Sequence, residues 1–193
     1  MLQIIDKSVN LLLTLAYVKG YLKVTHDSEN SLIEDLIRYA QNYIEDYTSR
    51  AITNNTYKYL YDTCDDINYI VAFSLRIQKG FITEIVSIKT YDTDQSETVY
   101  DVADFDIINA DQYSKIVQKD QADFPIGSRG YNPLVVDFKA GFTTTTLPYD
   151  LRTAICKLVA SYYEYRETMS PENMTEIPHG VIDILEKHRL EYF

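Results

Sequence analysis

The sequence contains few of the residues that interrupt regular structure, with six glycines and five prolines among 193 residues. This is too few for a long flexible linker. Hydrophobic residues make up 46% of the chain and charged residues 24%, which are the proportions of a globular protein and exclude a collagen-like or fully disordered chain. The length corresponds to one domain, or to one body with an embedded subdomain.

Long apolar runs are also missing. No stretch approaches the ~20 apolar residues needed to cross a bilayer. The apolar stretch Leu11–Tyr17 is preceded by no charged leader and followed by no small-residue cleavage site. We therefore expect a soluble protein that is not exported and has no membrane partner.

Cysteine and histidine, which are common zinc ligands, are scarce. Cys64 and Cys156 lie far apart and fit no metal or redox spacing, which favours a reducing, cytosolic origin. The three histidines form no metal-ligand motif. The sequence has no phosphate-binding glycine pattern, and the segment 127–130 lacks the nucleophile motif of hydrolases. We expect no metal, no cofactor and no catalysis.

One alternative stays open. Asp65, Asp66, Asp104 and His26 could form the pocket of a small acidic cytosolic enzyme or ligand-binding protein, with its site in the middle part of the chain. Acidic turn residues need no catalytic explanation in so acidic a chain, and a sequence cannot show that they converge.

Basic residues are outnumbered, with 18 lysines and arginines against 29 aspartates and glutamates and a net charge of −11. No basic run is present, although proteins that grip a phosphate backbone depend on clustered lysine and arginine. The same deficit argues against anionic membrane surfaces. An acidic protein could instead let DNA pass without binding it, because like charges repel. Simple solubility explains the same net charge, so both interpretations remain.

Tryptophan is absent, and 18 tyrosines stand against seven phenylalanines. Tyrosine has an apolar ring and a polar hydroxyl, and it suits half-buried positions and subunit contacts. A coding bias with ordinary core packing explains the same composition, so both interpretations remain.

Hydrophobic periodicity divides the chain into three parts. Residues 1–51 are predicted to be helical after an extended start, with one short helix at Thr14–Leu22. A longer amphipathic helix begins near Leu32, is capped by Asp27 or Ser28, and ends near Thr48. Residues 144–193 are predicted to hold one helix after Pro148, a last short helix and a tail.

The middle part, 52–143, changes to runs of β-branched and aromatic residues separated by polar turns, which predict a meandering antiparallel β subdomain. The strands are expected at 57–61, 69–75, 82–91, 99–102, 105–108, 114–117 and 134–138. The predicted fold is α+β: a small helical bundle built from the N- and C-terminal helices, with the β subdomain inserted between them.

The order of several short motifs resembles a known family. Near the start, Tyr21-Leu22-Lys23-Val24 and an acidic turn precede a helix that closes on Tyr43-Ile44-Glu45 and Tyr47-Thr48. Later, Ala140-Gly141-Phe142 precedes Leu147-Pro148, and a helix runs from Ala154-Ile155 through Tyr162-Tyr163-Glu164-Tyr165-Arg166-Glu167. This layout is similar to that of the head–tail connector, or adaptor, proteins of long-tailed bacteriophages and prophages. One departure is His188, where the family often has an aromatic residue or proline before Arg189.

The resemblance implies a structural virion protein, made in the bacterial host cytoplasm and located at the head–tail junction. Such connectors form a ring, usually a dodecamer, beneath the portal. They extend the DNA channel and provide the docking surface for the stopper or tail-completion protein. The implied partners are further copies of the chain, the portal and the stopper, with DNA passing through the channel without specific binding.

The resemblance also suggests where contacts lie. Tyr163, Arg166 and Glu167 are expected near subunit contacts, although Arg166 and Glu167 equally suit a solvated last helical turn. A C-terminal tail, expected to order only on docking, would meet the portal through Arg189, Leu190, Tyr192 and Phe193. A frayed terminus is the alternative for Tyr192 and Phe193.

Overall fold

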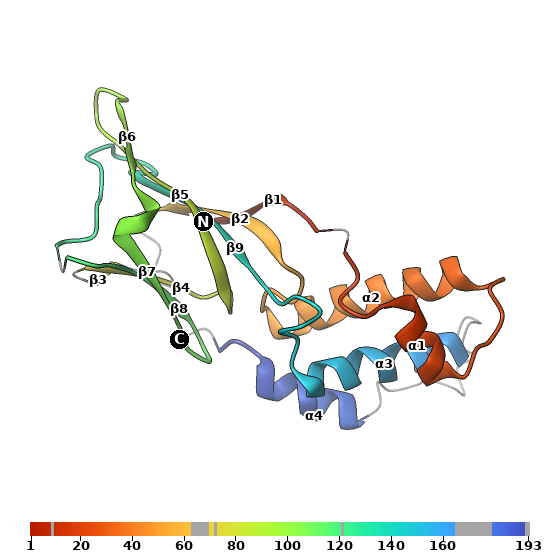
Figure 1. Ribbon diagram of the computed structural model, residues 1–193. Coiled ribbons are helices and arrows are strands. Elements are labelled where there is room, and N and C mark those ends of the chain that lie inside the picture. The colour runs from red at the N-terminus through yellow and green to blue at the C-terminus, as the bar shows by residue number, and fades with distance from the viewer. Residues whose placement is uncertain (9, 63–69, 72, 121, 165–178, 192–193) are drawn as a thin grey trace. The chain divides into compact units, whose positions relative to one another are not determined.

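The structure is a computed structural model that describes residues 1–8, 10–62, 70–71, 73–120, 122–164 and 179–191. The chain forms two compact units (Figure 1). The strand unit contains Met1–Ser8, Asn54–Gly141 and Leu190–Phe193, and the helical unit contains Val9–Thr53 and Phe142–Arg189. The chain therefore passes between the units four times, after Ser8, Thr53, Gly141 and Arg189. The predicted α+β class is confirmed.

The helical unit combines helices from both ends of the sequence. Its helices are α1 (Leu15–Leu22), α2 (Asn30–Thr48), α3 (Tyr149–Glu164) and α4 (His179–His188). The hydroxyl of Thr14 caps α1 by accepting a hydrogen bond from the Tyr17 amide, which is the role that threonine commonly has at this position.

The predicted cap of α2 is wrong. The helix follows Glu29, whose side chain makes no capping hydrogen bond. Asp27 instead accepts hydrogen bonds from Lys19 Nζ at 2.7 Å and Asn30 Nδ2 at 3.3 Å. Ser28 bonds the His26 ring. These side-chain partners come from α1 and the turn, so the residue order alone did not reveal them.

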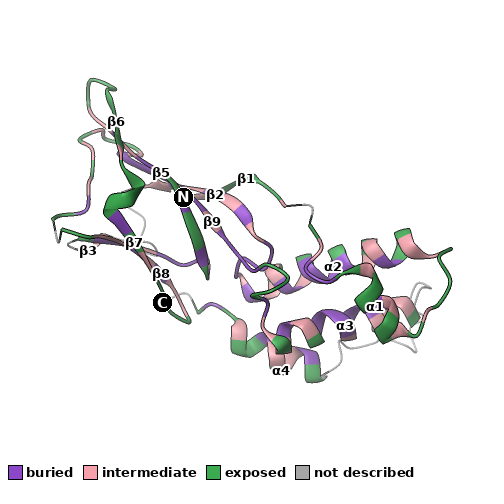
Figure 2. Cartoon of the chain, viewed as in Figure 1, coloured by how far each residue is buried: buried purple, intermediate pink, exposed green. Residues whose placement is uncertain are grey.

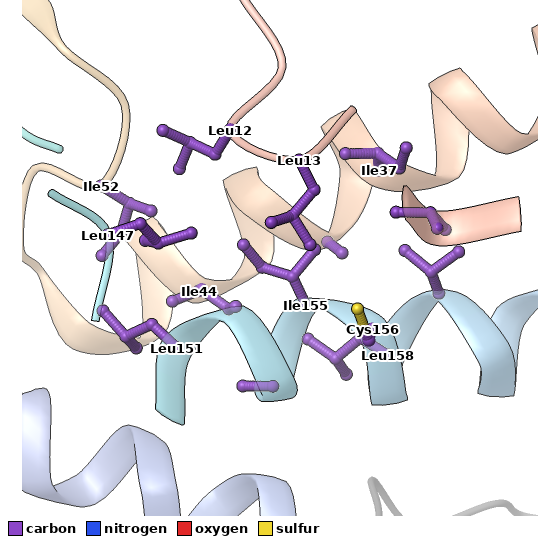
Figure 3. Close-up of a cluster of buried hydrophobic side chains, with 14 of the residues drawn as sticks. Leu12, Leu13, Ile37, Ile44, Ile52, Leu147, Leu151, Ile155, Cys156 and Leu158 are labelled. Carbon is purple, nitrogen blue, oxygen red and sulfur yellow. The ribbon is translucent and has the colours of Figure 1, made fainter. Parts of the chain in front are cut away.

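The core of the helical unit is a cluster of buried hydrophobic side chains (Figure 3). Helices α2 and α3 supply most of it, because their apolar residues recur every three or four positions and so share one face. Gln41 is a buried polar residue in this region, and its Oε1 accepts a hydrogen bond from the Leu12 amide at 2.9 Å. Buried Arg50 donates from Nε to the carbonyl of His188 at 2.9 Å, which ties the segment after α2 to the end of α4.

The strand unit contains two antiparallel sheets. The first has the order β1 (Leu2–Asp6), β2 (Asn55–Tyr61), β9 (Leu134–Ala140), β5 (Ile82–Tyr91) and β6 (Glu97–Tyr100). The second has the order β3 (Ile70–Val71), β4 (Ser74–Ile77), β8 (Ser114–Gln118) and β7 (Phe105–Asn109), with a 3-10 turn at Val102–Asp104. Tyr57 of β2 lies opposite Phe138 of β9, and their rings stack with centroids 5.7 Å apart.

The sheet order differs from the predicted meander. β9 lies between β2 and β5, so the last strand of the unit becomes the centre of its first sheet. The strand expected at 69–75 is two strands, β3 and β4. The extended start at Leu2–Asp6 pairs with β2, and residues 1–8 group with the strands and not with the helices. The pairings of β1 with β2 and of β9 with β2 and β5 join strands far apart in the sequence, so no local pattern specifies them.

Candidate subunit-contact and docking sites

The predicted subunit-contact residues lie at the end of α3. Tyr163 is half-buried, and its hydroxyl donates a hydrogen bond to the carboxylate of Glu29, at the start of α2. This contact joins two helices within one chain. Arg166 and Glu167 lie outside the described residues.

The predicted docking tail follows α4. Arg189 is exposed, lies 3.5 Å from Glu186 in an ion pair and stacks over the Tyr47 ring. Leu190, in contrast, is only 2% exposed, and the amide of the next residue, Glu191, donates to Gln112 Oε1 at 3.0 Å. Leu190 therefore does not fit a segment that orders only on docking.

Tyr192 and Phe193 lie outside the described residues. The described part of the C-terminal segment thus ends with a buried leucine, followed by a hydrogen bond from the Glu191 amide to a side chain of the turn before β8. A docking role for Arg189 and for the last two residues stays a prediction.

An exposed aromatic cluster on α1 and α3 was not predicted from the sequence. The guanidinium of Arg152 lies 5.3 Å from the Tyr149 ring centroid and 5.8 Å from that of Tyr17. Tyr149 is 82% exposed, and Arg152 is fixed by a hydrogen bond from Nη2 to the Thr144 carbonyl at 3.1 Å. Tyrosine and arginine are the residue types most enriched at interface hot spots. The spacing of Tyr149 and Arg152 was visible in the sequence, but the approach of Tyr17 was not.

A second aromatic cluster involves α2 and α3. Tyr39 and Tyr162 meet edge to face with ring centroids 5.0 Å apart, and Tyr39 remains exposed. Burial, together with the neighbouring Tyr39 and Tyr43, raises the pKa of Tyr162 to about 12. Tyr162 is therefore neutral at any physiological pH and contributes as an apolar ring with a hydroxyl group.

A loop of the strand unit docks on the turn between β5 and β6. Asp92 accepts hydrogen bonds from the amide of Ser128 at 2.9 Å and from its hydroxyl at 2.7 Å. Arg129 lies between the rings of Tyr91 and Tyr131, 4.4 and 4.5 Å from their centroids. The hydrogen bonds from the Ser128 amide and hydroxyl hold the pKa of Asp92 below its ordinary value.

The stability that the docked loop gives to the fold should accordingly decrease at acidic pH. Because the pKa of Asp92 is lower in the folded chain than in the unfolded one, its carboxylate stabilises the fold above about pH 4 and loses this effect as the pH falls through the folded value. We expect Asp92→Asn to lower the melting temperature at pH 6 and to do so progressively less towards pH 3. Asp120→Asn, a change at an exposed turn, serves as the control. A melting-temperature difference that is the same at every pH would contradict this role.

The residues proposed for an enzymatic pocket are not brought together within either unit of the described chain. His26 belongs to the helical unit and Asp104 to the strand unit; both are exposed. Asp65 and Asp66 lie outside the described residues. Among the residues that the structure describes, no three His, Cys, Asp or Glu side chains are placed to hold a metal ion. No helix in the described ranges is long and apolar enough to span a membrane.

Comparison with known proteins finds a family that the chain resembles over part of its length. The family model of phage gp6-like head-tail connector proteins matches residues 13–101, which include α1, α2 and the strands from β2 to β6. The resemblance to phage head–tail connectors is confirmed. Curated protein sequences gave no match. The matched range crosses from the helical unit into the strand unit, so the connector pattern is not confined to one of them.

Three chains of known structure share the fold along their whole length. They come from the neck of an empty gene transfer agent (GTA) particle computed with C6 symmetry, the virion of a native GTA particle, and the neck of a native GTA particle computed with C12 symmetry. Their sequence identities are 21%, 20% and 21%, and their TM-scores are 0.74, 0.76 and 0.73. Each match covers 100% of this chain and 97% of the other. The connector-like chain thus has the complete fold of these particle proteins, including the parts beyond residue 101.

Proposed function

We propose that the chain is a structural head–tail connector that forms a ring under the portal of a phage or phage-like particle. The ring extends the DNA channel and gives the stopper or tail its docking surface. The observation that carries this proposal is the match over the whole chain to proteins from particle necks with six- and twelve-fold symmetry. The family match at residues 13–101 supports it independently.

The charge of the strand unit suits this function. The stretch between Lys89 and Lys115 contains no basic residue but several acidic ones, most of them exposed: Asp92, Asp94, Glu97, Asp101, Asp104, Asp106 and Asp111. Such a surface repels DNA, because like charges oppose close approach. DNA would pass such a connector without specific binding. The proposal assigns no catalytic step to the chain.

Assembly with the portal tests the function. The full chain, mixed with the portal protein of the same virus, is expected to form a ring with one defined copy number, measured by mass photometry and electron microscopy. A chain that stays monomeric at high concentration and does not bind the portal would overturn the proposal.

The same assay examines the C-terminal docking segment. Removal of Tyr192 and Phe193 is expected to weaken portal binding while the melting temperature stays near that of the full chain. The matched variant is Leu190→Ala, which should lower the melting temperature because Leu190 is buried. Unchanged portal affinity in the truncated chain would exclude the last two residues from docking.

A further inference from the structure

The first sheet of the strand unit has two unpaired edges. Its outer strands are β1 and β6, and no other described strand pairs with their outer sides. All four neighbouring pairs in this five-stranded sheet are antiparallel. With an odd number of antiparallel strands, the two edge strands run in the same direction. The β6 edge of one copy can therefore lie beside the β1 edge of the next copy with the two strands parallel, as a repeating arrangement requires.

The hydrogen bonds of β1 show which of its groups point outward. Met1 and Leu60 exchange two backbone bonds, from the Met1 amine to the Leu60 carbonyl at 2.7 Å and from the Leu60 amide to the Met1 carbonyl at 2.8 Å. Because antiparallel pairs alternate, the next outward-facing amides are those of Leu2 and Ile4. The side chains of Ile4 and Ile5 are half exposed, at 50% and 51%. Figure 2 colours β1 largely as exposed.

The outward groups of β6 follow from its hairpin. The Asp92 amide donates to the Ser96 carbonyl at 3.1 Å, and the Gln95 amide donates to the Asp92 carbonyl at 2.9 Å. Gln95 has a positive φ of 65°, which completes a three-residue turn with a bulge. By the same alternation, the amides of Glu97 and Val99 point away from β5. Val99 is 60% exposed.

Both edges are only partly protected against pairing. Native edge strands are blunted by short length, charged side chains, proline, bulges or covering segments. Of these, β6 has its short length and the charge of Glu97, and β1 has a bulge near its end. Neither β1 nor β6 contains proline, and each exposes apolar side chains. The bulge in β1 lies between Ile4 and Asp6, at the end of the strand, so the segment from Leu2 to Ile4 keeps a regular register.

We propose that the β1 edge of one copy pairs in parallel with the β6 edge of the next copy, so that the sheets continue around the ring. This inference rests on the proposed function. Its partner is a second copy because the two edges differ, run in the same direction and lie on one sheet. A contact between two different surfaces of identical chains repeats and closes into a ring, whereas a two-fold contact stops at a dimer. In the parallel arrangement Lys7, just after β1, comes to the same end of the pair as Asp101, just after β6, with opposite charge.

Proline variants test the two edges separately. Ile4→Pro and Val99→Pro each remove one outward-facing amide, and proline at such an edge position breaks no bond within the chain. Ile4→Thr and Val99→Thr keep the amide and serve as controls. We expect each proline variant to raise the concentration needed for half-maximal assembly about tenfold or more, from the lost hydrogen bond and the steric block. The threonine variants should need a concentration for half-maximal assembly close to that of the wild type.

Mixing the two proline variants separates this arrangement from others. Each variant retains the edge that the other lacks, so the mixture should give dimers and no rings. Normal rings from Val99→Pro would mean that β6 takes no part in the ring contact, and would overturn the proposal. Rings from both proline variants at wild-type concentrations would overturn it while leaving the connector function intact.

Hydrogen exchange on the wild-type chain tests the same contact without any substitution. It therefore remains informative if the proline variants fail to fold. The amides of Leu2, Ile4, Glu97 and Val99 should exchange more slowly in the ring than in the unassembled chain. Equal exchange in the two states would contradict the edge pairing. A wild-type chain that forms no ring with or without its portal would instead overturn the connector function, and this proposal with it.

Discussion

Leu158→Ala is expected to destabilise the helical unit by about 2–5 kcal/mol. Leu158 is 1% exposed on α3 and belongs to the cluster that joins α2, α3 and α4. Truncation removes apolar contacts and leaves a cavity that close-packed neighbours fill only in part. The measurement is urea unfolding followed by helical circular dichroism.

Leu32→Ala makes the same chemical change at a partly exposed position on α2, where the side chain is 37% exposed. It should cost much less, because little packed volume is lost. Equal losses in the two variants would show that Leu158 does not lie in a tightly packed site. The unfolding midpoint and the slope should be compared together, since a changed slope indicates a changed unfolded state.

Gly127→Ala is expected to destabilise the strand unit by about 1–3 kcal/mol, the usual cost of overpacking. A Cβ at this position would overlap the backbone carbonyl oxygen of Tyr91. The Gly127 amide also donates to the Pro133 carbonyl at 3.3 Å. The added methyl group should therefore push the loop off the β5–β6 turn and break the Asp92–Ser128 bonds.

Gly130→Ala provides the matched control three residues later, because nothing lies within 4 Å of a Cβ there. Thermal unfolding and the rate of protease cleavage in the loop measure both variants. Gly127→Ala should melt earlier and be cleaved faster, and Gly130→Ala should resemble the wild type. If the two alanine variants behaved alike, the close packing of the loop against β5 would be wrong.

The sequence predicted the elements whose signals are local. The apolar stripe of α2, the Pro148 that precedes α3 and the β-branched run of β5 are each specified by adjacent residues. The capping of α2 was not predictable, because Lys19 on α1 occupies the side chain of Asp27. The central place of β9 was not predictable either, since its two neighbours, β2 and β5, both lie far from it in the sequence.

The candidate contact residues also divide into those with a local sequence signal and those whose contacts depend on distant residues. The motif that contains Tyr163 was visible in the sequence, but its bond to Glu29 depends on how α3 meets α2. Leu190 was predicted as part of a tail from the family resemblance, and its burial depends on contacts with distant residues. The two free edges of the first sheet could not be identified before the strand order was known, because β1 and β6 look like ordinary amphipathic strands.

The four passages of the chain between the units have a consequence for any fragment study. Each unit is assembled from separate lengths of polypeptide, so neither can be produced as one uninterrupted piece of the gene. A protease that nicks the backbone once, at any of these passages, would still leave a helix bundle whose two halves are held by its shared core. A chain cleaved at one of these passages should consequently keep its helical unit folded until a denaturant is added.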